Sequence, residues 1–520
     1  MAALMLAFVL LCTFLYYSFF IKPMNYWKEK KVFHLSALGS FLRTVFSGKS
    51  FFDATLDLYR KYPSRRYFGN YTLLKPTLFV RDLDLIKAIT IKDFEHFTDH
   101  FTFFQSDPIL GNNLFELQGE RWKDMRSTLS PAFTSAKMKG MYAFIEETAE
   151  NFTKHLYDMN TEEIELKKEF TMFSNDVIAT CAFGINCDSF NNENNDFFSM
   201  GTELITPSPR RKLRMFFSLM FPKIFKAIGI PIISQNILNF FKQIVIENME
   251  TREKHNIFRP DMIHLLMEAK KGRLKVETNK VDQDDGYAVV QESTIQKSIR
   301  KMEITDNIIA AQAILFVIGG LDTNSTTLAL MSHQLAIHQD IQRRLQQEVD
   351  EVFKQCDGKL TYEEVLKMKY LDQVISEVLR RYPLGYAIMR KCVKDYKIES
   401  FKRSESTFIL EKGASVTIPI VGIHMDPFLF PNPEKFDPER FSDENKKLII
   451  PGSYMPFGSG PRNCIGSRFA LLECKTVMVH LLRKFDIVPT KNTRNPLRFK
   501  KNITVSSKDG FWLGLRKRKP

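Results

Sequence analysis

The chain has 520 residues, of which 74 are Lys or Arg and 60 are Asp or Glu, so its formal net charge is +14. With 44% hydrophobic and 26% charged residues and no low-complexity tract, it is neither disordered, nor collagen-like, nor a multi-span membrane protein. Its seven cysteines are odd in number and show no CxxC spacing, which argues against a disulfide framework and favours a reducing compartment. No basic stretch is interleaved with aromatic residues, so a nucleic acid partner is not expected.

The amino terminus carries a membrane signal. Residues 1–21 have no charged side chain, and four lysines follow within the next ten residues. A helix of this length covers about 30 Å, enough to span a bilayer, and the lysines favour a cytosolic location for the rest of the chain. A cleaved secretory signal is the alternative, but no basic segment precedes the apolar run and no clear cleavage site follows it. We therefore expect a retained anchor.

The chain is then divided into a transmembrane anchor (1–21), a linker (22–50) and a single catalytic domain (51–520). The apolar segment is not the amphipathic, Arg- and Ser-rich type of a mitochondrial presequence. The expected location is therefore the endoplasmic reticulum membrane, with the catalytic domain facing the cytosol.

After the anchor, helical periodicity dominates, and strand-like runs are short and few. The predicted strands are 72–80, 407–410 and 415–420, and a hairpin turn is predicted at 411–413 between the last two. The predicted helices are 144–157, 237–252, 306–338 and 341–353. The fold class is therefore mainly α with a small β part.

Two segments depart from this pattern. Residues 215–241 combine Phe, Ile, Met and Leu with a few lysines, so they form either an interfacial element on a membrane or an ordinary buried helix pair. Residues 271–304 are polar, charged and nearly free of apolar periodicity, which predicts a long surface connection.

A glycine-rich loop around Cys464 is the most informative part of the chain. Residues 457–466 have the sequence FGSGPRNCIG, directly before a helix predicted to begin near Ser467. Here an arginine, backbone N–H groups and the helix dipole are expected to stabilise a thiolate, which suits a soft metal. Zinc needs about four ligands in paired spacings, and only Cys474 follows, with no histidine nearby. A single axial thiolate to haem iron remains.

The pattern F-x-x-G-x-R-x-C-x-G resembles the haem-binding loop of the cytochrome P450 family, the haem-thiolate monooxygenases. The resemblance extends from the anchor to the last strand-like segment and is close to insect microsomal members of the clan that includes vertebrate drug- and steroid-oxidising enzymes. It implies a cytochrome P450 fold and haem, iron protoporphyrin IX, as cofactor. Cys464 would be the metal ligand, and Phe457, Arg462 and Gly466 would help to bind haem.

Two further constellations match the family. Glu377 and Arg380 form its E-x-x-R pair, and Arg440 lies in a P-E-R-F segment that the pair would bond, so we interpret all three as structural. Trp122 and Arg126 match W-x-x-x-R and lie one helical turn apart. The candidates for binding the haem propionates are Arg126, Arg390 and Arg462, with Trp122 and His424 as further cofactor-binding candidates.

A third constellation lies in the predicted helix 306–338. Gly319 and Gly320 each destabilise a helix interior by about 1 kcal/mol relative to alanine. Their presence therefore indicates that the backbone must stay free of side chains at this point. In the family, [AG]-G-x-[DE]-T bends this helix over the haem, and its acid and threonine help deliver protons to dioxygen. Asp322 and Thr323 match as catalytic residues, whereas Asn324 stands where the family often has Thr or Ser.

The resemblance implies a monooxygenase that inserts one oxygen atom from O2 into lipophilic small molecules, either xenobiotics or endogenous lipids and hormones. The chain has no convincing nucleotide-binding fingerprint, so NADPH electrons would arrive through NADPH-cytochrome P450 reductase and sometimes cytochrome b5. The segments implied as pocket walls are 101–117, 311–323, 384–388 and 506–510.

Two alternative functions remain at this point. A haem-thiolate isomerase or dehydratase would act on peroxides without a reductase, although such relatives tend to lose the acid–threonine pair that this chain keeps. A non-enzymatic haem sensor or carrier would not need the dioxygen groove. Reductase-dependent NADPH consumption separates the monooxygenase from both.

Overall fold

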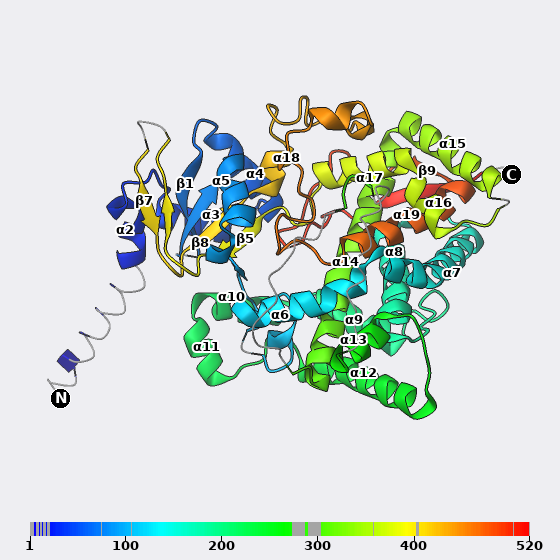
Figure 1. Ribbon diagram of the computed structural model, residues 1–520. Coiled ribbons are helices and arrows are strands. Elements are labelled where there is room, and N and C mark those ends of the chain that lie inside the picture. The colour runs from blue at the N-terminus through cyan, green and yellow to red at the C-terminus, as the bar shows by residue number, and fades with distance from the viewer. Residues whose placement is uncertain are drawn as a thin grey trace.

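The architecture is that of a computed structural model, shown in Figure 1. It describes residues 5–6, 10, 13, 17, 21–73, 75–105, 107–272, 286–289, 303–356, 358–401, 405–502 and 504–518. The predicted anchor, residues 1–21, therefore lies mostly outside the described residues.

Most of the described chain is helical, as expected. The helices are α2 Lys22–Glu29, α3 Ala37–Phe46, α4 Phe51–Lys61, α5 Leu83–Lys87, α6 Gly119–Leu129, α7 Ser135–Met159, α8 Leu166–Ile178, α9 Asp196–Ile205, α10 Pro209–Met220, α11 Pro222–Ile228, α12 Gln235–His255, α13 Met262–Lys270, α14 Asp306–Ile337, α15 Gln339–Gln355, α16 Tyr362–Lys367, α17 Lys369–Arg381, α18 Ile420–His424 and α19 Ser467–Lys484. All four helices predicted from periodicity are present, as α7, α12, α14 and α15.

The strands are short and form three sheets. They are β1 Tyr67–Thr72, β2 Lys75–Val80, β3 Asp99–His100, β4 Ile164–Glu165, β5 Ile388–Lys391, β6 Tyr396–Ile398, β7 Phe408–Leu410, β8 Ser415–Ile418, β9 Phe485–Pro489 and β10 Trp512–Lys517. The sheet orders are β1-β2-β8-β5-β3, β4-β10-β9 and β6-β7. In the five-stranded sheet, β2 and β8 are parallel and β8 and β5 antiparallel.

Two strand predictions need correction. The predicted strand 72–80 contains a turn, because β1 ends at Thr72 and β2 runs back beside it from Lys75. The predicted hairpin at 411–413 is wrong. Gly413 does form a turn, with φ of 95°, but β7 pairs with β6 while β8 crosses to β2 and β5, so the flanking strands belong to different sheets.

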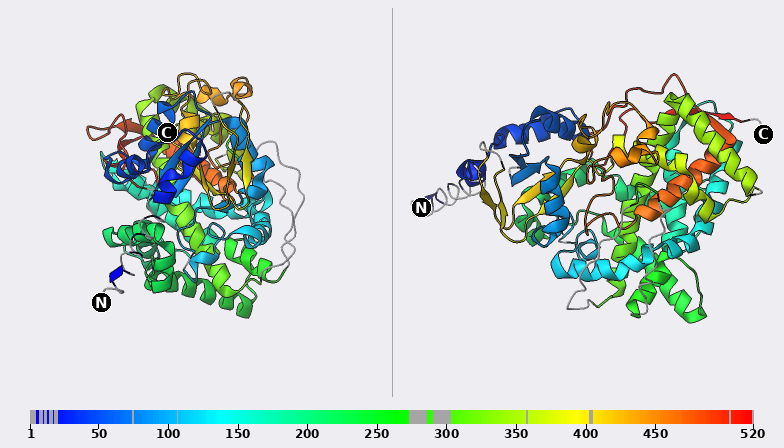
Figure 2. Two further views of the ribbon diagram at one scale, coloured as in Figure 1. Left: turned by 90° about the vertical axis from the view of Figure 1, so that its left-hand side faces the viewer. Right: turned by 45° about the horizontal axis from the view of Figure 1, so that its top comes forward.

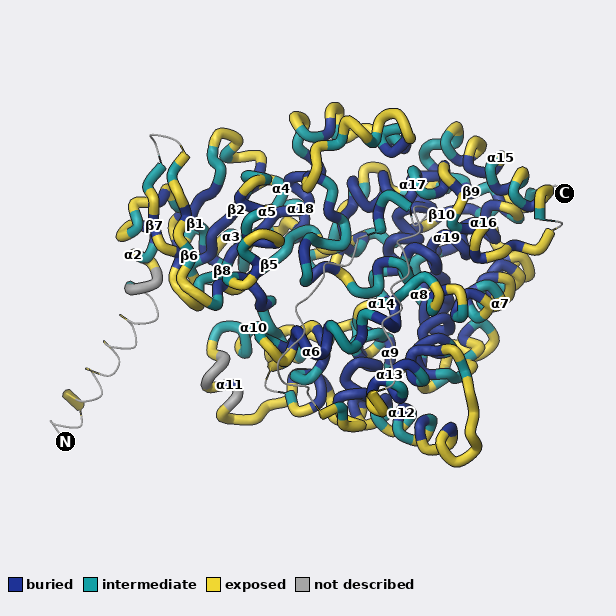
Figure 3. Tube along the Cα trace, viewed as in Figure 1, coloured by how far each residue is buried: buried dark blue, intermediate teal, exposed yellow. Residues whose placement is uncertain are grey.

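Helix α14 is the axis of the helical part. Figure 1 shows it running through the middle of the molecule, and Figure 3 shows that much of it is buried. Among the described residues it is also the one helix long and apolar enough to cross a membrane, but its burial marks it as a core helix. The β-rich part lies to one side of these helices, so the chain brings its sheet and its helical core together around α14 and the loop before α19.

The segment predicted as a linker, 22–50, contains α2 and α3 and packs on the sheet. Trp27 is fully buried and donates its indole N–H to the Asn70 carbonyl at 3.0 Å. A Cβ on Gly69 would lie 2.4 Å from the Trp27 ring, so only glycine admits this contact. The chain is therefore fixed to β1 directly after the predicted anchor.

The segment 215–241 divides between its two interpretations. Among the described residues of α10 none is buried, whereas Ile237, Leu238 and Phe241 of α12 are buried in the core. The first part is thus an exposed apolar face and the last part an ordinary core helix.

Candidate active site

The loop before α19 holds Cys464 by a close backbone approach. The Cys464 amide donates to the Phe457 carbonyl at 2.9 Å, which closes the loop on itself. Gly458 and Gly460 have φ of 85° and 73°, and a Cβ on Gly460 would lie 1.7 Å from the Thr90 carbonyl oxygen. The loop therefore needs glycine at 460 both for its backbone conformation and for space.

Cys464 faces an internal hollow. Its side chain is exposed, yet burial raises the pKa of its thiol, so the space it faces is enclosed by protein. The N–H of Gly466 and the charge of Arg126 lower this pKa but do not outweigh burial. Desolvation thus opposes ionisation of the free thiol while the other two groups favour it, and the thiolate stays a prediction.

The far wall of this hollow is α14. Gly319 is exposed although it lies mid-helix, and a Cβ there would have no neighbour within 4 Å. Phe133 connects the two walls, because its ring lies 5.9 Å from that of Phe316 and a Cβ on Gly466 would lie 3.9 Å from it. Gly319 and the cysteine loop thus face one interior space, whereas Gly320 packs on α8, where a Cβ would lie 2.9 Å from Ile178 Cδ1.

Arg126 and Arg462 meet at the cysteine loop from different directions. Arg126 is buried and donates to the backbone and side-chain oxygens of Asn463 at 3.0 and 2.7 Å. Arg462 donates to the carbonyls of Thr98 at 2.7 Å and Leu117 at 2.6 Å, and its guanidinium lies 4.1 Å from the centre of the Trp122 ring. The cation that acts on Cys464 is therefore Arg126 rather than Arg462.

Arg390 completes a buried cluster of cations. The register of β3 and β5 places His100 opposite Arg390, and Arg390 Nη1 lies 2.9 Å from His100 Nδ1. Burial lowers the pKa of Arg390 to about 9 and that of Arg462 well below its usual value, and Arg390 lowers the latter further. His100 also has a strongly lowered pKa, from burial and then from both arginines. Sequence reasoning missed His100, since only the strand pairing brings it here.

His424 lies deep behind the loop. Its Nε2 accepts the Met455 amide at 2.9 Å and its Nδ1 lies 3.2 Å from the Arg380 carbonyl. Burial lowers its pKa to about 3, so the ring is neutral with the proton on Nδ1. Both nitrogens thus bond backbone groups, one just before the cysteine loop and one at the end of α17, and a bond to haem stays a prediction.

The E-x-x-R pair bonds the chain segment that precedes the cysteine loop. Glu377 and Arg380 are fully buried and doubly bonded, at 2.6 and 2.8 Å, and Arg440 Nε lies 3.5 Å from Glu377. Arg380 also donates to the carbonyls of His424 and Pro433, both at 2.8 Å. The three charged side chains meet as predicted and fix the segment that leads to the cysteine loop.

Asp322 and Thr323 lie on α14 next to its exposed glycine. The Thr323 hydroxyl donates to the Gly319 carbonyl at 2.5 Å. The Asp322 carboxylate accepts from Lys167 Nζ at 2.8 Å, and the same ammonium donates to Ser325 Oγ at 2.6 Å. Burial lowers the pKa of Lys167, a residue on α8 that sequence patterns do not single out.

Asn324 points away from this pair. It is buried and donates from Nδ2 to Oε2 of Glu473 on α19, whose other oxygen accepts from Ser174 Oγ at 2.7 Å. Burial raises the pKa of Glu473 to about 8. Asn324 therefore joins α14 to α19, the helix that starts behind the cysteine loop.

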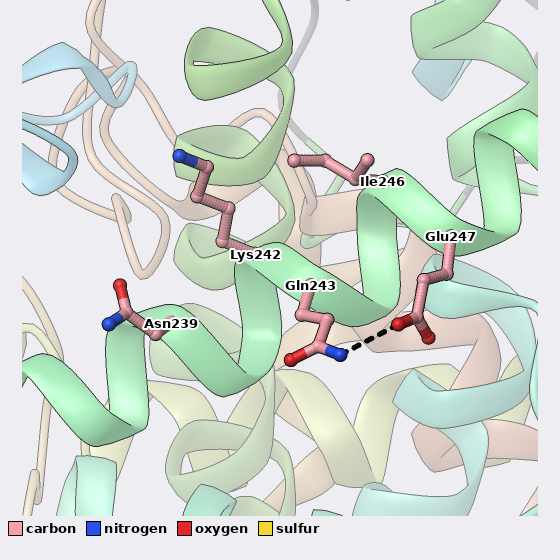
Figure 4. Close-up of a pocket in the computed structure, with 5 residues that line it drawn as sticks. All are labelled: Asn239, Lys242, Gln243, Ile246 and Glu247. Carbon is pink, nitrogen blue, oxygen red and sulfur yellow. Dashed lines mark hydrogen bonds between the residues drawn. The ribbon is translucent and has the colours of Figure 1, made fainter.

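A separate hollow lies on the outer face of α12, away from these groups. Figure 4 shows its five lining side chains, with Gln243 donating to Glu247 at 2.7 Å. All five come from one exposed helix face, and none belongs to the cysteine loop or to α14. It is a surface feature, unlike the enclosed space at Cys464.

Residues 34–513 match the cytochrome P450 family. The chain is 43% identical to cytochrome P450 9e2 of Blattella germanica, with 92% of this chain and 91% of that protein covered. It is 39% identical to probable cytochrome P450 9f2 of Drosophila melanogaster, covering 96% and 95%, and 34% identical to cytochrome P450 6k1 of Blattella germanica, covering 97% and 94%.

The chain belongs to the cytochrome P450 family. Members of this family are haem-thiolate monooxygenases that take NADPH electrons from a reductase and act on lipophilic small molecules. The mainly helical fold with small sheets is the cytochrome P450 fold, and the resemblance inferred from the cysteine loop is confirmed.

The residues at the hollow fit haem. Arg126, Arg390 and Arg462 place buried positive charge there, and the carboxyl groups that act on Arg462 are those of Asp99 and Glu116. Within the described chain, Arg390 Nε has no hydrogen-bond partner. Buried guanidinium groups need anions, and the two propionates of haem would meet that need.

Proposed function

We propose that this chain is an endoplasmic reticulum cytochrome P450 in which Cys464 is the axial iron ligand. The observation that supports this most directly is the Cys464 thiol, which is open to an enclosed hollow whose opposite wall carries the exposed Gly319. Haem iron, when bound, supplies the activation of dioxygen and the transfer of one oxygen atom to the substrate. Arg126, Arg390 and Arg462 would bind the propionates.

The chain's own part in the chemistry is the handling of protons. Asp322 is partly exposed and bonded to Lys167, so it can exchange protons with solvent while keeping a fixed position. Thr323, the next residue, holds its hydroxyl on the Gly319 carbonyl at the open side of the helix. We assign Asp322 to proton uptake and Thr323 to proton delivery into the hollow.

The substrate would lie against residues 101–117. Gln312 of α14 holds this loop by accepting the Leu114 amide and donating to the Asn112 carbonyl, both at 2.9 Å, and Arg462 holds Leu117 from the other side. Glu116 accepts the Phe103 amide at 3.0 Å inside the loop. The phenylalanines of this loop form an apolar wall, which is consistent with lipophilic substrates.

We also propose that the molecule sits on the membrane by its anchor and by α10 and α11. These two helices expose four apolar side chains, Leu213, Phe217, Ile224 and Ile228. Arg210 and Lys212 of α10 are also exposed. Figures 1 and 2 show α10 and α11 on the same flank as α2, the helix that follows the predicted anchor. Reductase, and cytochrome b5 where it takes part, would reach the body from the cytosol.

The absorption spectrum of the reduced, carbon-monoxide-bound protein tests the ligand assignment. Wild type should show the strongly red-shifted band of a thiolate-bound haem, and Cys464→Ser should lose it. Cys356→Ser, at a half-buried position after α15, is the control and should keep the band. If haem-loaded wild type lacks the band, the assignment is wrong.

A further inference from the structure

The polar connection 271–304 contains a short segment that docks on the helical core. Residues 286–289, here called the internal strap, are the described part between residues 272 and 303. Ala288 within it is 2% exposed, as buried as the core helices. The sequence predicted a surface connection, so this docking is a finding that composition did not indicate.

The backbone of the strap is fixed by α17 and α19. The Tyr287 amide donates to Asp372 Oδ2 at 2.8 Å, and the other oxygen of Asp372 lies 3.1 Å from Lys475 Nζ, which is fully buried on α19. Gly286 has φ of 90°, and a Cβ there would lie 2.3 Å from Asp372 Oδ1. The approach of the strap therefore depends on glycine at 286.

The ring of Tyr287 reaches the segment that precedes the cysteine loop. Its centre lies 5.4 Å from the Tyr454 ring and 5.2 Å from the Phe441 ring. Tyr454 in turn donates to the Ser376 carbonyl at 3.0 Å and stacks on His424 at 5.3 Å. Tyr287 thus covers one face of a cluster whose other members belong to the core.

This cluster is continuous with the cysteine loop. The residue after Tyr454 is Met455, whose amide donates to His424 Nε2 at 2.9 Å and whose carbonyl accepts the Gly458 amide at 3.0 Å. Phe457, two residues further, accepts the Cys464 amide at 2.9 Å. A shift of Tyr454 would therefore be passed to the backbone that sets the position of Cys464.

We propose that the internal strap positions the cysteine ligand: Tyr287 holds Tyr454 against His424, and Tyr454 fixes the start of the cysteine loop. The proposal rests on the proposed axial role of Cys464. It makes Tyr287 a positioning residue, since it does not itself reach the hollow. The alternative, a strap that merely shortens a long connection, predicts no effect on the cysteine loop.

Three variants separate these alternatives. Tyr287→Phe keeps the ring, and no bond of the Tyr287 hydroxyl is seen in the described structure, so it should behave as wild type. Tyr287→Ala removes the ring, and Gly286→Ala displaces the strap by a different route, so both should have the same defect. Tyr157→Ala, which truncates a half-exposed ring packed on Phe485, is the control for loss of general stability.

The first measurement is the rate at which the reduced, carbon-monoxide-bound protein loses its thiolate-type band on mild heating. We expect Tyr287→Ala and Gly286→Ala to lose it at least threefold faster than wild type, with Tyr287→Phe and Tyr157→Ala unchanged. Equal rates for Tyr287→Ala and wild type would overturn the proposal. A defect shared by Tyr157→Ala would also overturn it, because the effect would then be general.

The second measurement does not depend on the iron ligand. Hydrogen exchange of the backbone amides in 454–464 should be at least threefold faster in Tyr287→Ala than in wild type or Tyr287→Phe. If wild type lacks the thiolate band, the proposed function fails, and this exchange still reports whether the strap holds the loop. Unchanged exchange would refute the holding role on its own.

Discussion

At the scale of single residues, buried carboxyl groups carry information that the sequence does not. Glu473 is fully buried on α19, bonded to Asn324 and Ser174, and burial raises its pKa to about 8 from an ordinary value of 4.5. Because the folded protein keeps this proton up to higher pH than the unfolded chain, the free energy of unfolding falls as pH rises between these two values.

Replacing Glu473 by Gln should remove this fall. The amide keeps an oxygen for Asn324 but cannot ionise. The free energy of unfolding of Glu473→Gln minus that of wild type should therefore be larger at pH 8 than at pH 5, by on the order of 3 kcal/mol. Denaturant unfolding at several pH values measures it. Glu444→Gln, at an exposed site, is the control, and parallel pH profiles for Glu473→Gln and wild type would contradict the argument.

The partner of Asp322 gives a second prediction at this scale. Lys167→Met removes the ammonium that bonds the Asp322 carboxylate, while the neighbouring Lys168→Met removes only an exposed pair with Glu193. Without its partner, Asp322 would lose the fixed position that we propose for proton uptake. Product formed per NADPH consumed should fall roughly 3- to 10-fold in Lys167→Met, a small part of what acid–base groups contribute, and stay unchanged in Lys168→Met. Equal yields in the two variants would exclude the positioning role.

At the scale of elements, the close approach of the cysteine loop to the short π-helix Ala88–Lys92 depends on Gly460. Gly460→Ala would place a Cβ 1.7 Å from the Thr90 carbonyl oxygen. Because that oxygen belongs to the backbone, the clash can be relieved only if one of the two segments moves. Gly452→Ala has a similar φ of 86° but no atom within 4 Å, so it should cost only about 1 kcal/mol of strain. Haem retention after gel filtration should be lost in Gly460→Ala and kept in Gly452→Ala. Haem retention in both variants would show that the loop can move away from Thr90 without losing the cofactor.

The sequence predicted elements that depend on local pattern and missed those that depend on pairing. The cysteine loop and the start of α19 follow from neighbouring residues, and both are found where expected. The turn at Gly413 was also local and correct, but its hairpin was wrong because strand partners are chosen across the sheet. His100, Lys167 and Glu473 were missed for the same reason, since only long-range packing brings them to Arg390, Asp322 and Asn324.

At the scale of the whole molecule, the flank that carries α10 has exposed apolar side chains. Figure 3 shows exposed chain on α10 beneath the sheet, and Lys75 of β2 donates to the Leu219 carbonyl at 3.0 Å, which ties this flank to the sheet. With α10 fixed in this way, its exposed apolar side chains keep a constant orientation relative to the hollow. A membrane on this flank would then present lipophilic compounds to the same side of the molecule each time.

Photo-crosslinking of the full chain in phospholipid vesicles tests this orientation. Two exposed phenylalanines serve as matched positions: Phe217 on α10 is 45% exposed, and Phe428 near α18 is 88% exposed. With p-benzoylphenylalanine placed at 217, mass spectrometry should find lipid adducts, because the proposed orientation would place this flank in the acyl region. The same group at 428 should give few, although it is the more exposed. Comparable adducts at both sites would mean that the body is held only by its anchor. Adducts at 428 alone would mean that it meets the bilayer by another face.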